Sequence, residues 1–211
     1  MKITVIGAGN MGTAFVKQLT KAGHQVRVTA RDIREAESVA ASNPGATAVA
    51  AKDAASHADV VILATGYGDA ADALRSVGDL QGKVVIDITN PLTSDYMGLT
   101  LGHDTSAAEE IAKAVPGAEV IKAFNTVFSQ VLAHGADFGE GRKVTVFIAG
   151  DSERGKQTVR TLAEGMGFET VDAGGLKNAR YQEPLAGLNI YLGYGAGLGT
   201  DIAPAWMNKA A

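Results

Sequence analysis

The chain has 211 residues, 46% hydrophobic and 20% charged, values typical of one soluble globular domain or one domain with an appendage. Its formal net charge of −4 and its pI near 5.6 argue against nucleic acid as the main partner. The lack of cysteine excludes disulfides, iron–sulfur ligation and a thiol nucleophile.

No apolar run approaches the roughly 18–20 residues that a membrane-spanning helix needs. The sequence opens with the strand-like segment KITVIG, without a charged leader followed by a long apolar stretch. We therefore expect a cytoplasmic protein that does not insert into a membrane.

Short β-branched runs alternate along the chain with Ala- and Leu-rich stretches of helical spacing, such as GTAFVKQLTKAG and AAEEIAKAVPGA. The predicted strands cover residues 2–7, 25–30, 59–65, 83–89, 119–124, 144–150 and 168–174, with a weaker one at 46–50. Strands that are apolar throughout and separated by helices indicate a mostly parallel sheet covered on both faces. The pattern predicts an α/β, doubly wound fold.

The character of the sequence changes after Asp172, where helical stretches are followed by glycines at 193, 195, 197 and 199. We predict that residues 1–172 form the α/β domain. Residues 173–211 are then a small C-terminal helical appendage that returns to the sheet and completes a substrate cleft.

The segment GAGNMG lies between the first predicted strand and the first predicted helix. Gly7 permits a sharp turn, Gly9 lets the backbone approach a pyrophosphate, and Gly12 lets helix and strand pack closely. Amides at the helix start then face the phosphates. A glycine-rich turn without a ligand is the alternative. The residues predicted to contact the phosphates are Gly7, Ala8, Gly9, Asn10, Met11 and Gly12.

The end of the second predicted strand, RVTARD, indicates which dinucleotide binds. Sites selective for NAD commonly place an acid there, whereas this sequence has Ala30 followed by Arg31, with Arg34 one helical turn later. An arginine can bond a 2′-phosphate bidentately, and Thr29 adds a hydroxyl. The sequence favours NADP (NADPH). In the alternative alignment, shifted by one residue, Asp32 would bind the ribose and both arginines would be solvated.

The remaining cofactor contacts are expected beyond the carboxyl ends of the later strands, because ligands of open α/β sheets bind there. We predict contacts to the nicotinamide half from Ala64, Thr65, Tyr67, Asn90, Pro91 and Asn125. Asn90 and Asn125 would position the reacting ring, although each could instead close its own loop through an Asx turn. Tyr67 is expected to wall the cofactor rather than to act as an acid.

Other polar side chains give weaker signals. For Lys122 we predict a snorkelling surface lysine, with a buried amine near the site as the alternative. The four histidines show no ligand spacing, and the sequence supports no metal site. No residue is assigned with certainty as a catalytic acid, base or nucleophile.

The segments VIGAGNMG, KAFNT and VDAGGLKNARYQEPLAGLNIYL together resemble the coenzyme F420-dependent NADP oxidoreductases and their bacterial relatives. The NADPH-binding domain of STEAP-type metalloreductases is also similar. The resemblance implies a Rossmann-type domain, often dimeric, that exchanges hydride between NADPH and a flat flavin-like ring. It implies that Gly195, Ala196 and Gly197 border that second ring. The loop ATGYG is richer in glycine than the proline-aromatic loop of the archaeal deazaflavin enzymes, and the segment AFNT is closer to the bacterial and metalloreductase-like versions.

Hydride transfer between two stacked rings requires orientation and exclusion of water more than an acid or a base. We therefore expect an NADP-dependent oxidoreductase that acts on a flavin-like acceptor, foremost coenzyme F420, and functions as a homodimer. The alternatives are NADPH-driven reduction of a flavin, a ferric chelate or a small imine, and a non-catalytic NADP-binding redox sensor.

Overall fold

The computed structural model describes residues 1–206, in which eight strands form one sheet in the order β3-β2-β1-β4-β5-β6-β7-β8. All neighbouring strands are parallel except β6 and β7, which are antiparallel. The strands are β1 (Lys2–Ile6), β2 (Gln25–Thr29), β3 (Ala46–Ala48), β4 (Val60–Leu63), β5 (Val84–Asp87), β6 (Glu119–Lys122), β7 (Thr145–Gly150) and β8 (Glu169–Gly174).

The helices lie between the strands and after β8. They are α1 (Asn10–Lys21), α2 (Ile33–Ala41), α3 (Ala70–Ser76), α4 (Ala107–Ala114), α5 (Ser129–His134), α6 (Glu153–Gly165) and α7 (Ala179–Ile190). A π-helical turn (Tyr191–Gly195) extends α7. None of the helices in the described part of the chain has both the length and the apolar composition needed to cross a bilayer.

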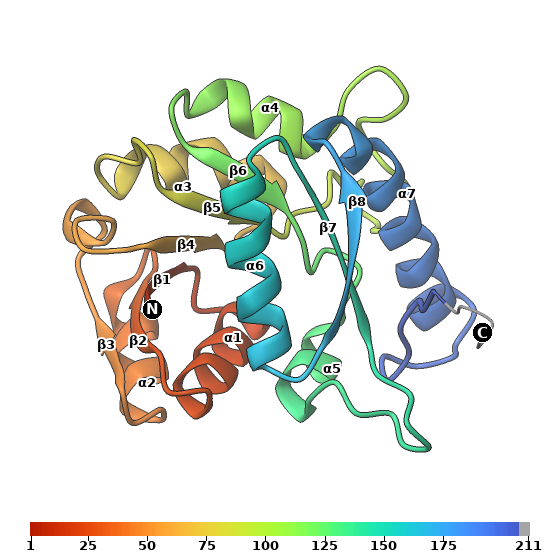
Figure 1. Cartoon of the computed structure of the whole chain (residues 1–211), viewed down its shortest axis with the longest axis horizontal. Helices are drawn as coiled ribbons and strands as arrows, with labels where there is room; N and C mark the ends of the chain where they lie inside the picture. The colour runs from red at the N-terminus through yellow and green to blue at the C-terminus, as the bar shows by residue number, and fades with distance from the viewer. Residues whose placement is uncertain (207–211) are drawn as a thin grey trace.

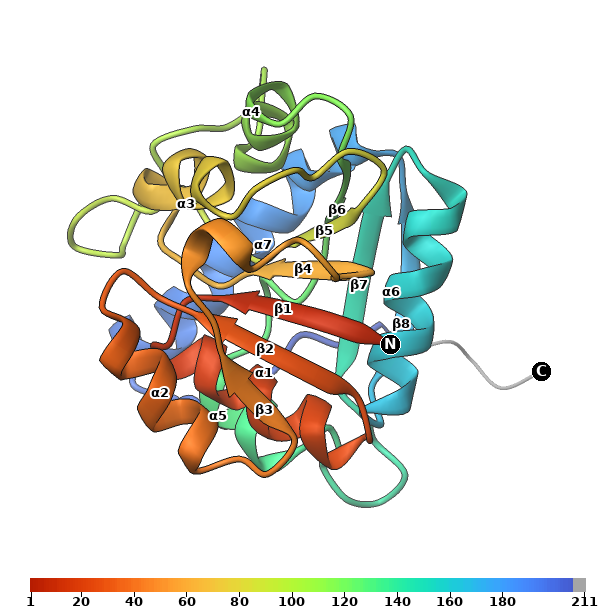
Figure 2. The ribbon, with the colours of Figure 1, turned by 90° about the vertical axis from the view of Figure 1, so that its left-hand side faces the viewer.

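Helices cover both faces of the sheet, as the apolar strands predict (Figures 1 and 2). Side chains of α1, α2, α5 and α6 pack on one face, and those of α3 and α4 pack on the other. Strands β4 and β5 are buried along their whole length because both of their faces are covered. The predicted Rossmann-type, mostly parallel fold with a helical C-terminal region is therefore confirmed. All eight predicted strands are present.

The sheet reverses its direction of growth between β1 and β4, because the chain adds β2 and β3 on one side and β4 to β6 on the other. Ligands of such sheets bind beyond the carboxyl ends of the strands at this switch point. The glycine turn after β1 lies there. The predicted boundary at residue 172 remains a prediction, and residues 207–211 of the predicted appendage lie outside the described residues.

A bidentate ion pair ties α7 to α4 on one side of the molecule. Arg180 donates through Nε and Nη2 to the two carboxylate oxygens of Glu109 at 2.8 and 2.7 Å. The hydrogen bonds from Arg180, with a further one from Ser106, hold the pKa of Glu109 below its usual range.

The lowered pKa of Glu109 predicts a pH-dependent contribution to stability. A carboxyl whose pKa is lowered by folding stabilises the protein above its unfolded pKa, and this stabilisation is lost as pH falls through the folded pKa. We expect Glu109→Gln to reduce the free energy of unfolding by about 1 kcal/mol at pH 7 and by less at pH 3. Urea unfolding at several pH values measures this difference. Parallel pH curves for the two proteins would contradict the prediction.

Candidate functional site

Two glycines at the junction of β1 and α1, Gly7 in the turn and Gly12 in the first turn of the helix, have no room for a side chain. A Cβ on Gly7, where φ is +113°, would lie 2.4 Å from the carbonyl oxygen of Ala64. A Cβ on Gly12 would lie 1.9 Å from the carbonyl oxygen of Gly7. Because Gly9 caps α1 without a side-chain hydrogen bond, the first amides of this helix are free to bind an anion.

On one side of this turn lies a cavity of about 530 Å³. Its wall includes Gly7 and Gly9 from the turn, Thr29 and Arg31 from the end of β2, and Thr65 from the end of β4. The hydroxyl of Thr29 is buried and has no hydrogen-bond partner within the described chain. A buried polar atom without a partner is unfavourable, so this hydroxyl fits a ligand that bonds to it.

The two arginines predicted to bind a 2′-phosphate differ in their surroundings. Arg31 is 89% exposed and lies 3.5 Å from the carboxylate of Asp69 across the cavity wall. Arg34 is held by Asp32, whose carboxylate also caps α2 through the Arg34 amide at 3.0 Å. These hydrogen bonds from Arg34 lower the pKa of Asp32. The guanidinium of Arg31 is therefore more available to a 2′-phosphate than that of Arg34.

A second cavity, of about 580 Å³, lies on the other side of the glycine turn. Its wall is mostly apolar and comes from the start of α1, the loops after β5 and β6, and the C-terminal helix. The lining residues include Met11, Ile88, Met97, Phe124, Phe128, Ile190 and Tyr194, with Asn90 and Asn125 as neighbouring polar groups.

Asn90 and Asn125 bond to each other across two loops instead of closing their own loops. Asn90 Nδ2 donates to the backbone carbonyl of Asn125 at 2.9 Å, and Asn125 Nδ2 donates to Asn90 Oδ1 at 3.1 Å. Asn125 Nδ2 also donates to the carbonyl of Gln182 in α7 at 3.0 Å. The side-chain oxygen of Asn125 is buried and has no partner in the part of the chain that the structure describes, so it fits an N–H donor such as a carboxamide.

The residue before Asn125 has an unusual backbone. Phe124 has φ of +60°, in the left-handed region that bulky side chains rarely adopt. Its buried ring packs edge-on against Phe15 at 5.1 Å and Phe168 at 5.7 Å between centroids. Backbone strain persists where packing determines it, and here it directs Asn125 to the cavity wall.

The two cavities are lined by consecutive residues at the start of α1. Gly9 lines the first cavity, and the next residue, Asn10, lines the second. A dinucleotide whose pyrophosphate lies at Gly9 can therefore place one half in each cavity. The unpartnered oxygens of Thr29 and Asn125, one in each cavity wall, fit such a ligand.

Comparison with known proteins places the chain in a family. Residues 2–91 match the family model described as NADP oxidoreductase, coenzyme F420-dependent. A hypothetical protein from Sinorhizobium meliloti is 33% identical in sequence, with a TM-score of 0.76 over 83% of this chain and 86% of that one. The chain belongs to the coenzyme F420-dependent NADP oxidoreductase family. The predicted family is thus confirmed.

Two further proteins that are similar to this chain differ from each other in length. A proposed F420-dependent NADP-reductase from Arthrobacter sp. FB24 is 28% identical, with a TM-score of 0.85 over 95% of this chain and 96% of that one. Metalloreductase STEAP3 of Rattus norvegicus is 30% identical over 185 residues, which are 87% of this chain and 36% of the relative. The chain spans about a third to a half of the length of the curated relatives it matches.

Most of the residues predicted to bind the cofactor line the two cavities. They are Gly7, Ala8, Gly9, Thr29, Arg31, Ala64 and Thr65 in the first, and Asn10, Met11, Asn90 and Asn125 in the second. Tyr67 packs instead against the hydrophobic cluster beneath α3 and α4. Burial, followed by the charges of Glu110 and Glu183, raises the pKa of Tyr67. Its contact with a cofactor stays a prediction.

The predicted second-ring segment, Gly195 to Gly197, lies at the end of the π-helical turn. Tyr194, just before it, lines the second cavity. A Cβ on Gly195 would lie 3.4 Å from the sulfur of Met97, which also lines that cavity. The segment is therefore next to the cavity, and its contact with a second ring stays a prediction.

The prediction for Lys122 is wrong. This lysine does not snorkel to the surface: its side chain is 0% exposed and forms ion pairs with Asp87 and Glu183. Sequence reasoning also missed both of these carboxylates. The available signal was an acid and a lysine in corresponding positions at the ends of two apolar strands, VVID and EVIK. The sequence around Glu183 contains no pattern that predicts its ion pair with Lys122.

Proposed function

We propose that this protein is an NADP-dependent oxidoreductase that transfers hydride between NADPH and a flavin-like acceptor, foremost coenzyme F420. The observation that carries the proposal is the pair of cavities on either side of the glycine turn, each with a buried oxygen that has no hydrogen-bond partner among residues 1–206. Arg31 beside the first cavity supplies the charge that a 2′-phosphate needs. Bound there, NADPH would supply the hydride.

The residues of the second cavity suit the reacting rings. Asn125 would hold the carboxamide of the nicotinamide through its free side-chain oxygen. Met11, Phe128 and Tyr194 would exclude water, and a flat acceptor could then stack on the nicotinamide ring. This chemistry needs two rings at near-attack distance and no proton donor, and we assign no acid or base to it.

A second candidate is reduction of an acceptor that carries no negative charge, such as a small imine or a neutral flavin ring. Among the described residues that line the second cavity, Asp95 is the charged one, and neither lysine nor arginine occurs there. A carboxylate at the wall disfavours an anionic ring. The similarity to a metalloreductase adds ferric chelates to the acceptors worth testing.

The test is an acceptor comparison with purified protein and NADPH, followed by the loss of absorbance of the reduced nicotinamide. We expect turnover with coenzyme F420 and weak or no turnover with FMN, ferric citrate or a cyclic imine. Turnover with only FMN, ferric citrate or the cyclic imine would identify that compound as the acceptor in place of coenzyme F420. Tight NADPH binding without turnover on any acceptor would favour a redox sensor. A cytoplasmic location is part of the proposal, since reduced cofactor is available there.

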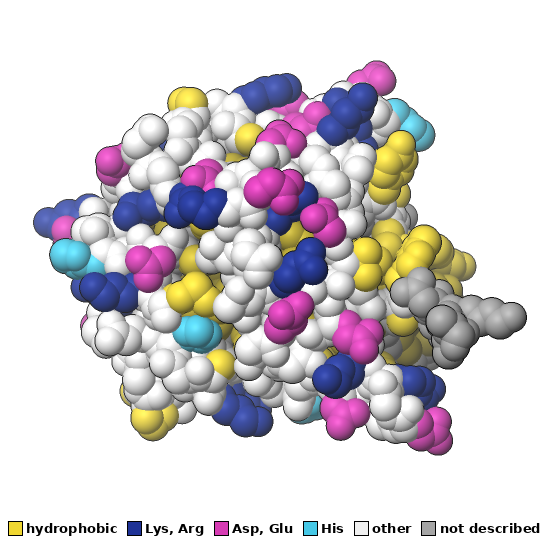
Figure 3. All heavy atoms as spheres, viewed as in Figure 1, with side chains coloured by type: hydrophobic (Ala, Val, Ile, Leu, Met, Phe, Trp, Pro, Cys, Tyr) yellow, Lys and Arg dark blue, Asp and Glu magenta, His cyan; other side chains and the backbone are white. Residues whose placement is uncertain are grey.

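We also propose a homodimer formed through the outer face of α7. This helix buries Gln182, Glu183 and Asn189, whereas large hydrophobic side chains point outward. Hydrophobic side chains also gather on the side of the molecule where α7 lies (Figure 3). Those on α7 and the segment after it that are more than half exposed are Tyr181, Leu188, Tyr191, Tyr194, Leu198 and Trp206.

The size of this surface suits a second copy of the chain. Six such side chains present on the order of 600–900 Å², and a standard interface buries about 800 Å² per partner. Light scattering should give twice the monomer mass for the wild-type protein and the monomer mass for Leu188→Glu. A wild-type monomer at micromolar concentration would refute the dimer.

A further inference from the structure

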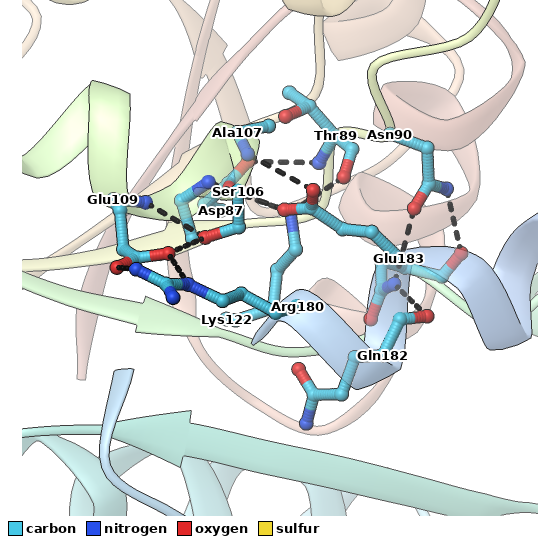
Figure 4. Close-up of polar contacts among 12 residues, drawn as sticks. Asp87, Thr89, Asn90, Ser106, Ala107, Glu109, Lys122, Arg180, Gln182 and Glu183 are labelled. Atoms are coloured by element: carbon cyan, nitrogen blue, oxygen red, sulfur yellow. Dashed lines mark hydrogen bonds and ion pairs between the residues drawn. The ribbon is translucent and has the colours of Figure 1, made fainter. Parts of the chain in front are cut away.

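Three charged side chains lie buried together beside the second cavity (Figure 4). Lys122, at the end of β6, donates to Asp87 Oδ2 at 2.7 Å and lies 2.8 Å from Glu183 Oε1. It also donates to the backbone carbonyl of Thr89 at 2.6 Å. The side chains of the three charged residues are at most 2% exposed. Two hydrogen bonds and one further ion pair therefore hold the ammonium group.

This cluster carries one positive and two negative charges, so it has one excess negative charge. The amides of Ala107 and Ala108, at the start of α4, donate to the Glu183 carboxylate at 2.9 and 3.2 Å. Oriented amides at a helix start offset negative charge. Even so, burying ions is unfavourable, and a packed apolar group of similar volume is often as stable or more stable. Stability alone therefore does not account for the cluster.

The cluster fixes both loops that hold the amide pair of the cavity. Asp87 accepts a hydrogen bond from the amide of Thr89 at 2.8 Å, and Lys122 donates to the carbonyl of Thr89. Both backbone groups of the residue before Asn90 are therefore hydrogen-bonded to the cluster. Glu183 holds α7, and the carbonyl of the preceding residue, Gln182, accepts from Asn125.

We propose that Lys122, with Asp87 and Glu183, is a positioning residue that sets the Asn90–Asn125 pair, and through it the nicotinamide ring, for hydride transfer. This inference rests on the proposed function. It assigns no contact between Lys122 and the cofactor. The ammonium group acts through the backbone of Thr89 and through α7.

The test separates positioning from folding by comparing a variant that breaks the cluster with one that neutralises it. Lys122→Met leaves two buried carboxylates without a cation and should lower the melting temperature strongly. The triple variant Asp87→Asn, Lys122→Met, Glu183→Gln leaves no charge in the cluster and should recover most of that loss. If the triple variant does not fold, Glu183→Gln alone serves, because Lys122 then still pairs with Asp87.

We expect the folded neutral variant to lose about 10- to 100-fold in kcat, as for a misplaced reacting ring. Its affinity for 2′,5′-ADP, which probes the first cavity alone, should stay within about twofold of the wild type, and its Kd for NADPH should rise. For Glu183→Gln the expected changes are smaller and in the same direction.

Lys156→Met is the matched control. Lys156, on α6, is another buried lysine, paired with Glu153 of the same helix and with Asp172 of β8. Its replacement should affect the melting temperature without affecting kcat. A neutral variant with wild-type kcat and NADPH affinity would overturn the proposal. If the wild-type protein reduces no acceptor, the proposed function fails, and the ratio of NADPH to 2′,5′-ADP affinities still tests the positioning.

Discussion

Replacing Gly9 by alanine should weaken NADPH binding without unfolding the protein, whereas replacing Gly12 should destabilise the fold itself. A Cβ on Gly9 meets no atom within 4 Å, and its φ of −73° suits alanine. The added methyl group would instead occupy the space through which the pyrophosphate approaches the backbone. We expect Gly9→Ala to change the free energy of unfolding by less than about 1 kcal/mol and to weaken NADPH by on the order of tenfold or more.

Gly12 differs because its neighbour is the protein backbone. A Cβ there would lie 1.9 Å from the carbonyl oxygen of Gly7, so α1 has to move away from β1. Overpacking of this kind costs about 1–3 kcal/mol, and it also disrupts the turn.

Thermal unfolding and fluorescence titration with NADPH distinguish the two glycine variants. If Gly9→Ala bound NADPH like the wild type, the pyrophosphate would not lie at this turn. If Gly12→Ala were as stable as the wild type, the close contact between α1 and β1 would not matter.

The fold was predictable because its signals are local. Each strand is a short apolar run bounded by glycine or polar residues, and each needed only its own residues to be recognised. The turn at Gly7 was also predictable, since its geometry permits few residues other than glycine. The antiparallel direction of β7 was not, because an apolar run is the same in either direction and the choice depends on how the chain returns after α5.

The site was predictable in part for the same reason. Residues that follow a strand end lie at one edge of the sheet, so the proximity of Asn90 and Asn125 could be anticipated. The hydrogen bonds between them could not, since they depend on the left-handed backbone of Phe124 and on its packing with Phe15 and Phe168. The burial of Lys122 depends on Glu183, a partner on a distant helix that no local pattern reveals.

The choice of cofactor depends on Arg31, and its replacement by alanine should weaken NADPH much more than NADH. Arg31 is the better placed of the two candidate arginines, because Arg34 already bonds to Asp32. Charge-assisted hydrogen bonds contribute about 1.5–3 kcal/mol, so we expect Arg31→Ala to raise the Kd for NADPH roughly 10- to 150-fold. NADH has no 2′-phosphate and should bind either protein equally. Fluorescence titration with both cofactors measures the two ratios.

Two further variants test whether the effect belongs to Arg31 itself. Asp69→Asn removes the carboxylate that lies 3.5 Å from the Arg31 guanidinium, so NADPH should bind this variant as tightly as the wild type or more tightly. Arg142→Ala, in the exposed loop before β7, removes a positive charge at a distance from the cavities and should leave both affinities unchanged. If Arg31→Ala weakened the binding of NADPH and of NADH equally, the Arg31 side chain would shape the cavity without binding the 2′-phosphate. In that case Asp32, at the start of α2, becomes the residue to test for ribose binding, because a carboxylate there would select NAD.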